Sequence, residues 1–368
     1  TTLYHLIFVV KIKIIMKVCI LGNSLTSLTL AKTLVNQGIY VDMIPDIKTI
    51  KPDKLRTIGI SKSNLNFFNK NILDIENLTW KIKRIKIFSD HLQDKEILNF
   101  EEDNNLFSIV QNSELYKILI LSLKKNVLFK LKKNNTYQNL SNNYDLVLNC
   151  NSNHLITKKF FYKKIDKNYE SKAFVSIIEH KKIEKNTTAI QFFTKKGPLA
   201  FLPVSKTKTS IVYSVKGKDK IDFKSQIKKY GSKFHITKIY EPKNFKLKSS
   251  ILRVYFKENF LAFGDLLHKI HPLAGQGFNM TLRDIIVLLS IIKSKKDNGL
   301  PLDNSVCREF EKKVRHKNYL FSNGIDFIYE FFNFESKLKN TILSKSIQLL
   351  GEKKIVNKLF TKLADKGV

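Results

Sequence analysis

The stretch that most constrains the fold is residues 261–284, LAFGDLLHKIHPLAGQGFNMTLRD. It predicts a short apolar strand ending at Gly264 and Asp265, then a turn containing Gly275 and Gly277, then a long helix. Glycines between a strand and a helix let backbone N–H groups approach a ligand closely, and the helix N-terminus favours negative charge. The pattern therefore indicates a ligand-binding strand–turn–helix unit.

Two features of this unit support that interpretation. Asp265, at the end of the strand, is placed to accept hydrogen bonds from the hydroxyls of a sugar. The apolar residues of the helix recur at helical spacing and predict a core-facing side: Phe278, Leu282, Ile285, Ile286, Leu289 and Ile292. An alternative stays open, because a glycine-bearing turn can also join a strand to a helix without binding a ligand.

A second strand–turn–helix unit stands near the start of the chain. Residues 17–22, KVCILG, predict a buried strand of a parallel sheet, and residues 39–44 predict a second strand. The helix between them is capped by Asn23 or Ser24 and ends at Gly38. This β-α-β unit has the length that dinucleotide binding requires.

The glycine pattern of this unit is incomplete. Dinucleotide-binding units carry G-x-G-x-x-G after the first strand. This chain keeps Gly22 but has Ser24 and Ser27 at the second and third glycine positions. The acidic residue expected after the second strand falls on Pro45, with Asp46 one residue later. Both serines are small, so the helix can still approach the strand.

The string from 264 to 284 closely resembles the second FAD motif of the ubiquinone-biosynthesis aromatic hydroxylases, which are class A flavoprotein monooxygenases. In that family the aspartate holds the ribityl chain of FAD. The glycine-rich turn and the helix N-terminus face the pyrimidine edge of the flavin. The resemblance implies that the following residues bind the cofactor: Gly264, Asp265, Pro272, Gly275, Gln276, Gly277, Phe278 and Asn279.

Weaker similarities add further residues to this expected FAD site. Gly22 belongs to it through the first glycine turn, and Arg56 lies in a segment similar to the family's RT-x-A-L-S stretch, whose arginine is close to the flavin. Without the resemblance, Arg56 reads equally well as a solvated surface residue. Residues 106–119 resemble a strand and helix in which Gln111 contacts the FAD phosphates and Ser113 caps the helix.

The expected substrate side also rests on the resemblance. Residues 173–215 contain four short strand-like runs, which predict an antiparallel sheet. The run GPLAFLPV is similar to the sheet that floors the substrate pocket in these hydroxylases, which implies Phe201 and Pro203 as pocket-lining residues. Residues 144–150 predict another buried strand, after which Asn151 and Ser152 replace the family's Asp-Gly.

The expected fold is α/β, with a Rossmann-like FAD-binding domain, an inserted antiparallel-sheet substrate domain and a C-terminal helical region. The FAD-binding domain is expected at 16–75, 106–160 and 251–300, and the substrate domain at 76–105 and 161–250. The C-terminal region, 301–368, is expected to hold helices at 307–317 and 322–334.

Charge limits the expected partners. Lys and Arg total 65 against 32 Asp and Glu, a net charge of +33. The lysines are spread between apolar residues along the chain, a composition that biased codon usage also produces. Since no recognition motif accompanies the charge, we expect no nucleic-acid partner. An anionic membrane surface ranks ahead of nucleic acid.

Both ends of the chain raise the membrane question. Residues 1–15 are apolar but too short to span a bilayer, and we expect a translated leader or start-site artefact in preference to a membrane anchor. The tail, residues 339–366, alternates apolar residues with lysine at helical spacing. Such a helix either packs on its own domain, which we favour, or lies on an anionic membrane.

The resemblance implies a reaction in which NAD(P)H reduces FAD and one oxygen atom of O2 is transferred to a phenolic ring that carries a polyprenyl tail. No catalytic side chain and no metal site is expected, because the flavin carries the chemistry. Expected surroundings are the cytoplasm, contact with the inner membrane face, and a ubiquinone-biosynthesis complex. The alternatives are an FAD-binding relative without hydroxylase activity, a non-catalytic subunit of such a complex and, last, a nucleic-acid-binding protein.

Overall fold

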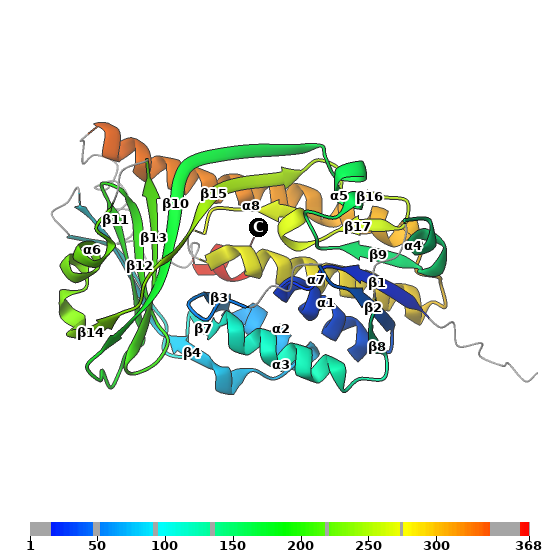
Figure 1. Ribbon diagram of the computed structural model, residues 1–368, viewed down its shortest axis with the longest axis horizontal. Helices are drawn as coiled ribbons and strands as arrows, with labels where there is room; N and C mark the ends of the chain where they lie inside the picture. The colour runs from blue at the N-terminus through cyan, green and yellow to red at the C-terminus, as the bar shows by residue number, and fades with distance from the viewer. Residues whose placement is uncertain are drawn as a thin grey trace, which may run out of the picture.

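Two sheets and a long helix organise the structure, a computed structural model. An α/β part and an antiparallel sheet lie at opposite ends of an elongated molecule, and strands β10 and β15 and helix α8 extend from one end to the other (Figure 1). The structure describes residues 16–46, 52–90, 95–132, 137–217, 221–272, 275–338 and 361–367.

The α/β part is built on a six-stranded sheet with the order β16-β17-β9-β1-β2-β8. Its strands pair in parallel except for β16 and β17. Residues 18–21 have no exposed surface, as expected for a parallel strand covered on both faces. The strands are β1 (Lys17–Leu21), β2 (Tyr40–Ile44), β8 (Phe129–Leu131), β9 (Leu146–Asn149), β16 (Phe256–Lys257) and β17 (Phe260–Ala262).

Helices surround this sheet and share its hydrophobic core. The first connects β1 to β2, as the sequence predicts, and Ser24 is its N-cap. The helices and the two short 3-10 turns of this part are α1 (Leu25–Asn36), α2 (Lys62–Asn71), η1 (Glu76–Leu78), α3 (Asn112–Lys124), α4 (Tyr137–Asn143), α5 (Leu155–Phe160), η4 (Gly264–Leu266) and α7 (Gln276–Asp297).

The second sheet contains nine strands, and all neighbours are antiparallel except β5 and β11. Helix α6 (Phe223–Tyr230) and the 3-10 turn η3 (Ser232–Phe234) pack on one of its faces. The strands are β5 (Arg84–Ser89), β6 (Lys95–Glu101), β10 (Lys164–His180), β11 (Thr188–Thr194), β12 (Gly197–Pro203), β13 (Lys208–Lys216), β14 (Ile236–Ile239), β15 (Lys243–Leu252) and β18 (His268–Lys269).

A three-stranded sheet joins the two parts, with β7 (Phe107–Gln111) between β3 (Thr57–Ser61) and β4 (Thr79–Ile82). Thus, of the strands expected at 76–105, β4 belongs to this sheet, whereas β5 and β6 extend the nine-stranded one.

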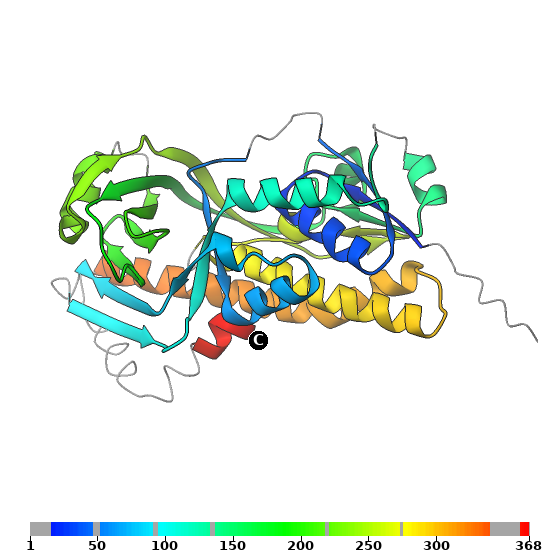
Figure 2. The same ribbon diagram turned by 90° about the horizontal axis from the view of Figure 1, so that it is seen from below.

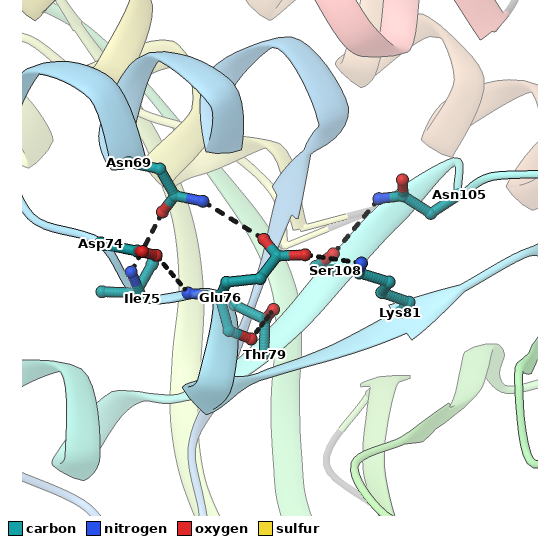
Figure 3. Close-up of polar contacts among 8 residues, drawn as sticks. All are labelled: Asn69, Asp74, Ile75, Glu76, Thr79, Lys81, Asn105 and Ser108. Carbon is teal, nitrogen blue, oxygen red and sulfur yellow. Dashed lines mark hydrogen bonds and ion pairs between the residues drawn. The ribbon is translucent and has the colours of Figure 1, made fainter.

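Polar contacts fix the chain where it passes from α2 to β4 (Figure 3). Asn69, near the end of α2, accepts a hydrogen bond from the N–H of Ile75 at 3.1 Å and donates to Glu76 Oε2 at 3.2 Å. Glu76 Oε1 lies 2.6 Å from Lys81 Nζ. In the segment that leads into β7, Asn105 Nδ2 donates to Ser108 Oγ of β7 at 3.3 Å (Figure 3).

The C-terminal region contains one long helix where the sequence predicts two, at 307–317 and 322–334. Helix α8 (Asn304–Leu338) runs without a break for 35 residues. Asn318, in the predicted gap, donates to Asp284 Oδ1 at 3.0 Å, and Asp284 Oδ2 lies 2.6 Å from His268 Nε2. These buried contacts tie α8 to α7 within the predicted gap, residues 318–321.

Helix α7 faces the core largely as predicted. Leu282, Ile285 and Ile292 are buried, but Ile286 is exposed, and Leu288 lies in the core in its place. Together with the two sheets and the helical C-terminal region, this arrangement confirms the predicted α/β fold class with an inserted antiparallel sheet.

A short helical segment, residues 361–366, lies against the start of α2 (Figure 2). Asp365 Oδ1 accepts a hydrogen bond from the N–H of Ser63 at 2.8 Å, so this end of the predicted tail packs on the protein. The predictions for residues 1–15 and for 339–360 fall outside the described residues. Within the described ranges, no helix combines the length and the apolar character needed to cross a membrane.

The continuity of α8 yields a test. We expect Gly324→Ala to raise the free energy of unfolding by about 0.5–1 kcal/mol, because Gly324 is inside the helix and an added Cβ meets open space. Gly299 is the control: it also has open space but a φ of +66°, so Gly299→Ala should destabilise. Urea unfolding of both variants measures this, and destabilisation by both would indicate a break in α8.

Candidate functional site

The carboxyl ends of β9, β1 and β2 lie side by side and place the first glycine turn. Gly22 follows β1 with a φ of +103°, which favours glycine. Ser24 Oγ accepts a hydrogen bond from the N–H of Ser27 at 3.3 Å. A helix leaves its first N–H groups, here those of Leu25 and Thr26, without intrahelical partners, and such a helix start favours an anion.

The second glycine turn packs directly on the start of α1. Gly264 has a φ of +64°, and a Cβ added to it would lie 2.6 Å from Thr26 Cγ2. Glycine is therefore required at this contact. Asp265, the next residue, is exposed, so its carboxylate is accessible from solvent.

The N-terminus of α7 lies against strand β3. Gly275 has a φ of +63°, and a Cβ there would be 3.7 Å from the backbone N of Gly59. Asn279 uses its whole side-chain amide in this contact. It donates to the carbonyls of Gly59 at 2.9 Å and Gly275 at 3.2 Å, and its Oδ1 accepts from the N–H of Ser61 at 2.9 Å. Asn279 thus positions the turn through its side chain.

Arg56 and Gln111 lie at the same end of the three-stranded sheet. Arg56 precedes β3, and its carbonyl accepts a hydrogen bond from the N–H of Asn112 at 3.0 Å. Gln111 ends β7 opposite Thr57 of β3. The prediction of Ser113 as the cap of α3 is wrong: the helix begins directly after the strand, and Gln111 takes the N-cap position.

The site contains buried polar atoms without partners in the described part of the chain. These are Oδ1 of Asn23, on the turn after β1, and Oε1 of Gln276, the first residue of α7. Such atoms are costly to leave unpaired, so each marks a place where a ligand or water could bind. A Cβ at Gly277 would meet nothing within 4 Å, which leaves the start of α7 open on that side.

The remaining predicted cofactor residues flank this opening. Pro272 is half-buried and leads into residues 273–274, which are outside the described ranges. Phe278 is half-buried and packs at the edge of the main core. Element contacts link η4 to α7, α7 to β3, and α7 to α1, so the structure brings the predicted cofactor residues into one region.

Phe201 and Pro203 lie away from this region. Phe201 has no exposed surface and packs on Phe234 at 5.3 Å between ring centroids, on the sheet face covered by α6. Pro203 is two residues after Phe201 in β12, so its side chain lies on the same face of the sheet. The opposite face points to the three-stranded sheet, since Leu202 packs in a cluster with Ile109 of β7. Phe201 and Pro203 therefore face the core beneath α6, and neither faces the region that holds the predicted cofactor residues.

Sequence reasoning missed two contacts. Ser210 Oγ of β13 lies 2.8 Å from Thr57 Oγ1 of β3, which joins the nine-stranded sheet to the site. Asn151 Nδ2, after β9, donates to Asp46 Oδ1, after β2. Partial burial raises the pKa of Asp46, and His154 acts in the opposite direction. Two signals in the sequence concerned these residues: Asp46 is one position later than the expected acid, and Asn151 replaces the aspartate of the family's Asp-Gly. Neither signal indicates that Asp46 and Asn151 are in contact.

Comparison with known proteins gives relatives by sequence. A scan against protein-family models found no match. The chain is 25% identical over 177 residues to ubiquinone hydroxylase UbiL of Rhodospirillum rubrum, covering 45% of this chain and 41% of the relative. It is 26% identical over 153 residues to 3-demethoxyubiquinol 3-hydroxylase of Escherichia coli, covering 39% of each. The matches thus span about two fifths of these curated relatives.

Comparison with solved structures covers nearly the whole chain. p-Nitrophenol 4-monooxygenase PnpA of Pseudomonas putida matches with a TM-score of 0.77 at 10% identity, over 96% of this chain and 98% of the other. A variant of HpxO of Klebsiella pneumoniae, complexed with FAD, matches with a TM-score of 0.72 at 12% identity, over 95% and 99%. These likenesses confirm the fold class, and the sequence relatives confirm the resemblance to ubiquinone-biosynthesis hydroxylases.

Asn279 provides a test of how the site is held. We expect Asn279→Ala to lower the free energy of unfolding by about 3 kcal/mol, because it removes the partner of the buried N–H of Ser61 and of the half-buried carbonyl of Gly59. Asn104→Ala, at an exposed turn, should change it by less than about 0.5 kcal/mol. Equal values for the two variants in urea unfolding would contradict this role of Asn279.

Proposed function

We propose that this chain, which resembles the ubiquinone-biosynthesis hydroxylases, is an FAD-dependent monooxygenase. It uses NAD(P)H and O2 to hydroxylate a phenolic ring that carries a polyprenyl tail. The observation that carries the proposal is the open start of α7 beside Gly264 and Asp265, in a chain with this fold and these relatives.

The glycines and the unpaired polar atoms of the site support the fit of FAD. Gly22 and Gly264 both adopt positive φ angles, and the backbone at Gly264 touches α1 where a Cβ would not fit. The unpaired Oε1 of Gln276 can accept a hydrogen bond from an N–H group, such as that of the flavin's pyrimidine ring. Together with the exposed carboxylate of Asp265, which can accept from the ribityl hydroxyls, this pair of acceptors fits the flavin half of FAD.

Roles follow for the individual residues. Asp265 accepts hydrogen bonds from the ribityl hydroxyls, and the free N–H groups at the start of α1 bind the pyrophosphate. The turn at Gly275, Gln276 and Gly277 presents backbone dipoles to the flavin ring, held in place by Asn279. Arg56 and Gln111 complete the polar border of the site. FAD, when bound, supplies the redox and oxygen-transfer chemistry, and we assign no catalytic side chain.

The substrate ring is proposed to bind between the cofactor site and the sheet face that carries Ala200, Leu202 and Val212. These side chains are only half-buried, and they alternate with the residues packed on α6. The contact between Thr57 and Ser210 brings this face to β3. An apolar face beside the flavin site suits an aromatic ring and excludes water from the reaction.

We also propose that the protein works in the cytoplasm at the inner membrane face, within a ubiquinone-biosynthesis complex. A polyprenyl substrate dissolves in the membrane, and a net charge of +33 favours an anionic surface. Co-sedimentation with vesicles of phosphatidylglycerol and of phosphatidylcholine tests this. Binding to the anionic vesicles alone, weakened by salt, is expected, and no binding to either would contradict it.

Titration with FAD tests the cofactor assignment. We expect the purified protein to quench FAD fluorescence and to bind the oxidised flavin. Asp265→Asn should weaken FAD binding about tenfold, because an amide accepts hydrogen bonds from hydroxyls less strongly than a carboxylate.

The matched control is Asp297→Asn, a substitution at an exposed position near the end of α7. It should leave FAD affinity unchanged. FAD binding that is equally strong in wild type and Asp265→Asn would remove Asp265 from the site. A protein that binds no FAD at all would overturn the proposed function.

A further inference from the structure

Asp46 and Asn151 meet over the end of strand β1. Asp46 follows β2 and Asn151 follows β9, and these strands flank β1 in the sheet. The region outside the carboxyl ends of such strands, where the strand order of the sheet reverses, is where nucleotides bind in open α/β folds. The contact between these two side chains therefore crosses the place expected for the pyrophosphate and ribose of a dinucleotide.

Gly22 lies beneath this contact. A Cβ added to Gly22 would be 3.4 Å from Cβ of Asn151, and the N–H of Gly22 donates to the carbonyl of Ile44 at 2.8 Å. The turn after β1 is thus close to both sides of the crossing. A pyrophosphate group that approached the start of α1 over Gly22 would meet Asn151 on its way.

Its own loop holds Asn151 in this position. The backbone N–H of Asn151 donates to Asn149 Oδ1 at 3.0 Å, and its carbonyl accepts from Thr157 Oγ1 at 2.6 Å. Its Oδ1 accepts from the N–H of Asn153 at 2.8 Å. With Oδ1 occupied, the amide group can only be oriented with Nδ2 toward Asp46. The donor is therefore presented to the carboxylate in a fixed direction.

The residue type at 151 decides whether this contact forms. An asparagine donates a hydrogen bond to the carboxylate of Asp46, whereas an aspartate at the same place would repel it. Asp46 is the acid nearest to the position that binds the ribose hydroxyls in dinucleotide-binding units. While it accepts from Asn151, one of its two oxygens is occupied.

We propose that Asp46 and Asn151 form a latch across the dinucleotide end of the site, and that FAD binds only when this hydrogen bond breaks. The proposal rests on the proposed function, since it concerns the same cofactor. The open latch frees Asp46 to accept hydrogen bonds from the adenosine ribose. FMN has the same flavin and ribityl chain but no adenosine half, so its binding leaves the latch closed.

Comparing the affinities for FAD and FMN distinguishes an effect of the latch from a general change of the fold. We expect Asn151→Ala to tighten FAD binding about tenfold, the size of one hydrogen bond to a charged group, and to leave FMN affinity unchanged. The matched control is Asn153→Ala, because Asn153 is exposed in the same loop and contributes only its backbone N–H. Fluorescence titration of the full chain with each flavin gives the dissociation constants.

A second variant keeps the test valid if Asn151→Ala does not fold. Asn151→Ser is too short to reach Asp46 but can still accept from the N–H of Asn153, and it should show the same gain for FAD. Equal FAD affinity in wild type and both variants would overturn the latch and leave the proposed function intact. A matching gain for FMN would also overturn the latch. Absence of flavin binding in every variant would overturn the proposed function itself.

Discussion

The contact between the start of α7 and strand β3 is the constraint on which the rest of the site depends. One buried side chain, Asn279, satisfies backbone groups on both sides of it. The same strand carries Arg56 at its entry and Thr57, which bonds to Ser210 of the nine-stranded sheet. The turn that we propose faces the flavin, the strand beside it and the nine-stranded sheet are therefore positioned by one small set of hydrogen bonds.

The end of the site that we propose for the dinucleotide is built differently from the end that we propose for the flavin. At Gly264 the chain keeps the glycine that close packing on α1 requires. Inside α1, Ser27 stands at a position where the dinucleotide-binding pattern has glycine, and its side chain is fully buried. Ser24 caps that helix with its own side chain. These replacements preserve the β-α-β unit but add polar side chains where a pyrophosphate would approach, and the contact of Asp46 with Asn151 adds another.

Local patterns predicted most of the fold, and long-range contacts account for what they missed. The strand–turn–helix units at 17–44 and 261–284 follow from apolar runs, glycines and caps. Helix α8 continues through the predicted gap, where Asn318 contacts Asp284, a partner 34 residues away that no local pattern indicates. The alternation of side chains along a strand shows that Phe201 and its neighbours lie on opposite faces of the sheet. It does not show which of these faces α6 covers. Asp46 and Asn151, separated by 105 positions, are brought together only by the order of the sheet.

Oxygen transfer by a flavin to a phenolic ring is the reaction that we propose for this site. The most direct measurement is mass spectrometry of the product after the protein, FAD and NAD(P)H react with a prenylated phenol under ¹⁸O2. We expect a hydroxylated product that contains one ¹⁸O atom and forms together with NAD(P)H consumption. Consumption of NAD(P)H without labelled product would contradict the proposed reaction, and so would a hydroxyl oxygen derived from water.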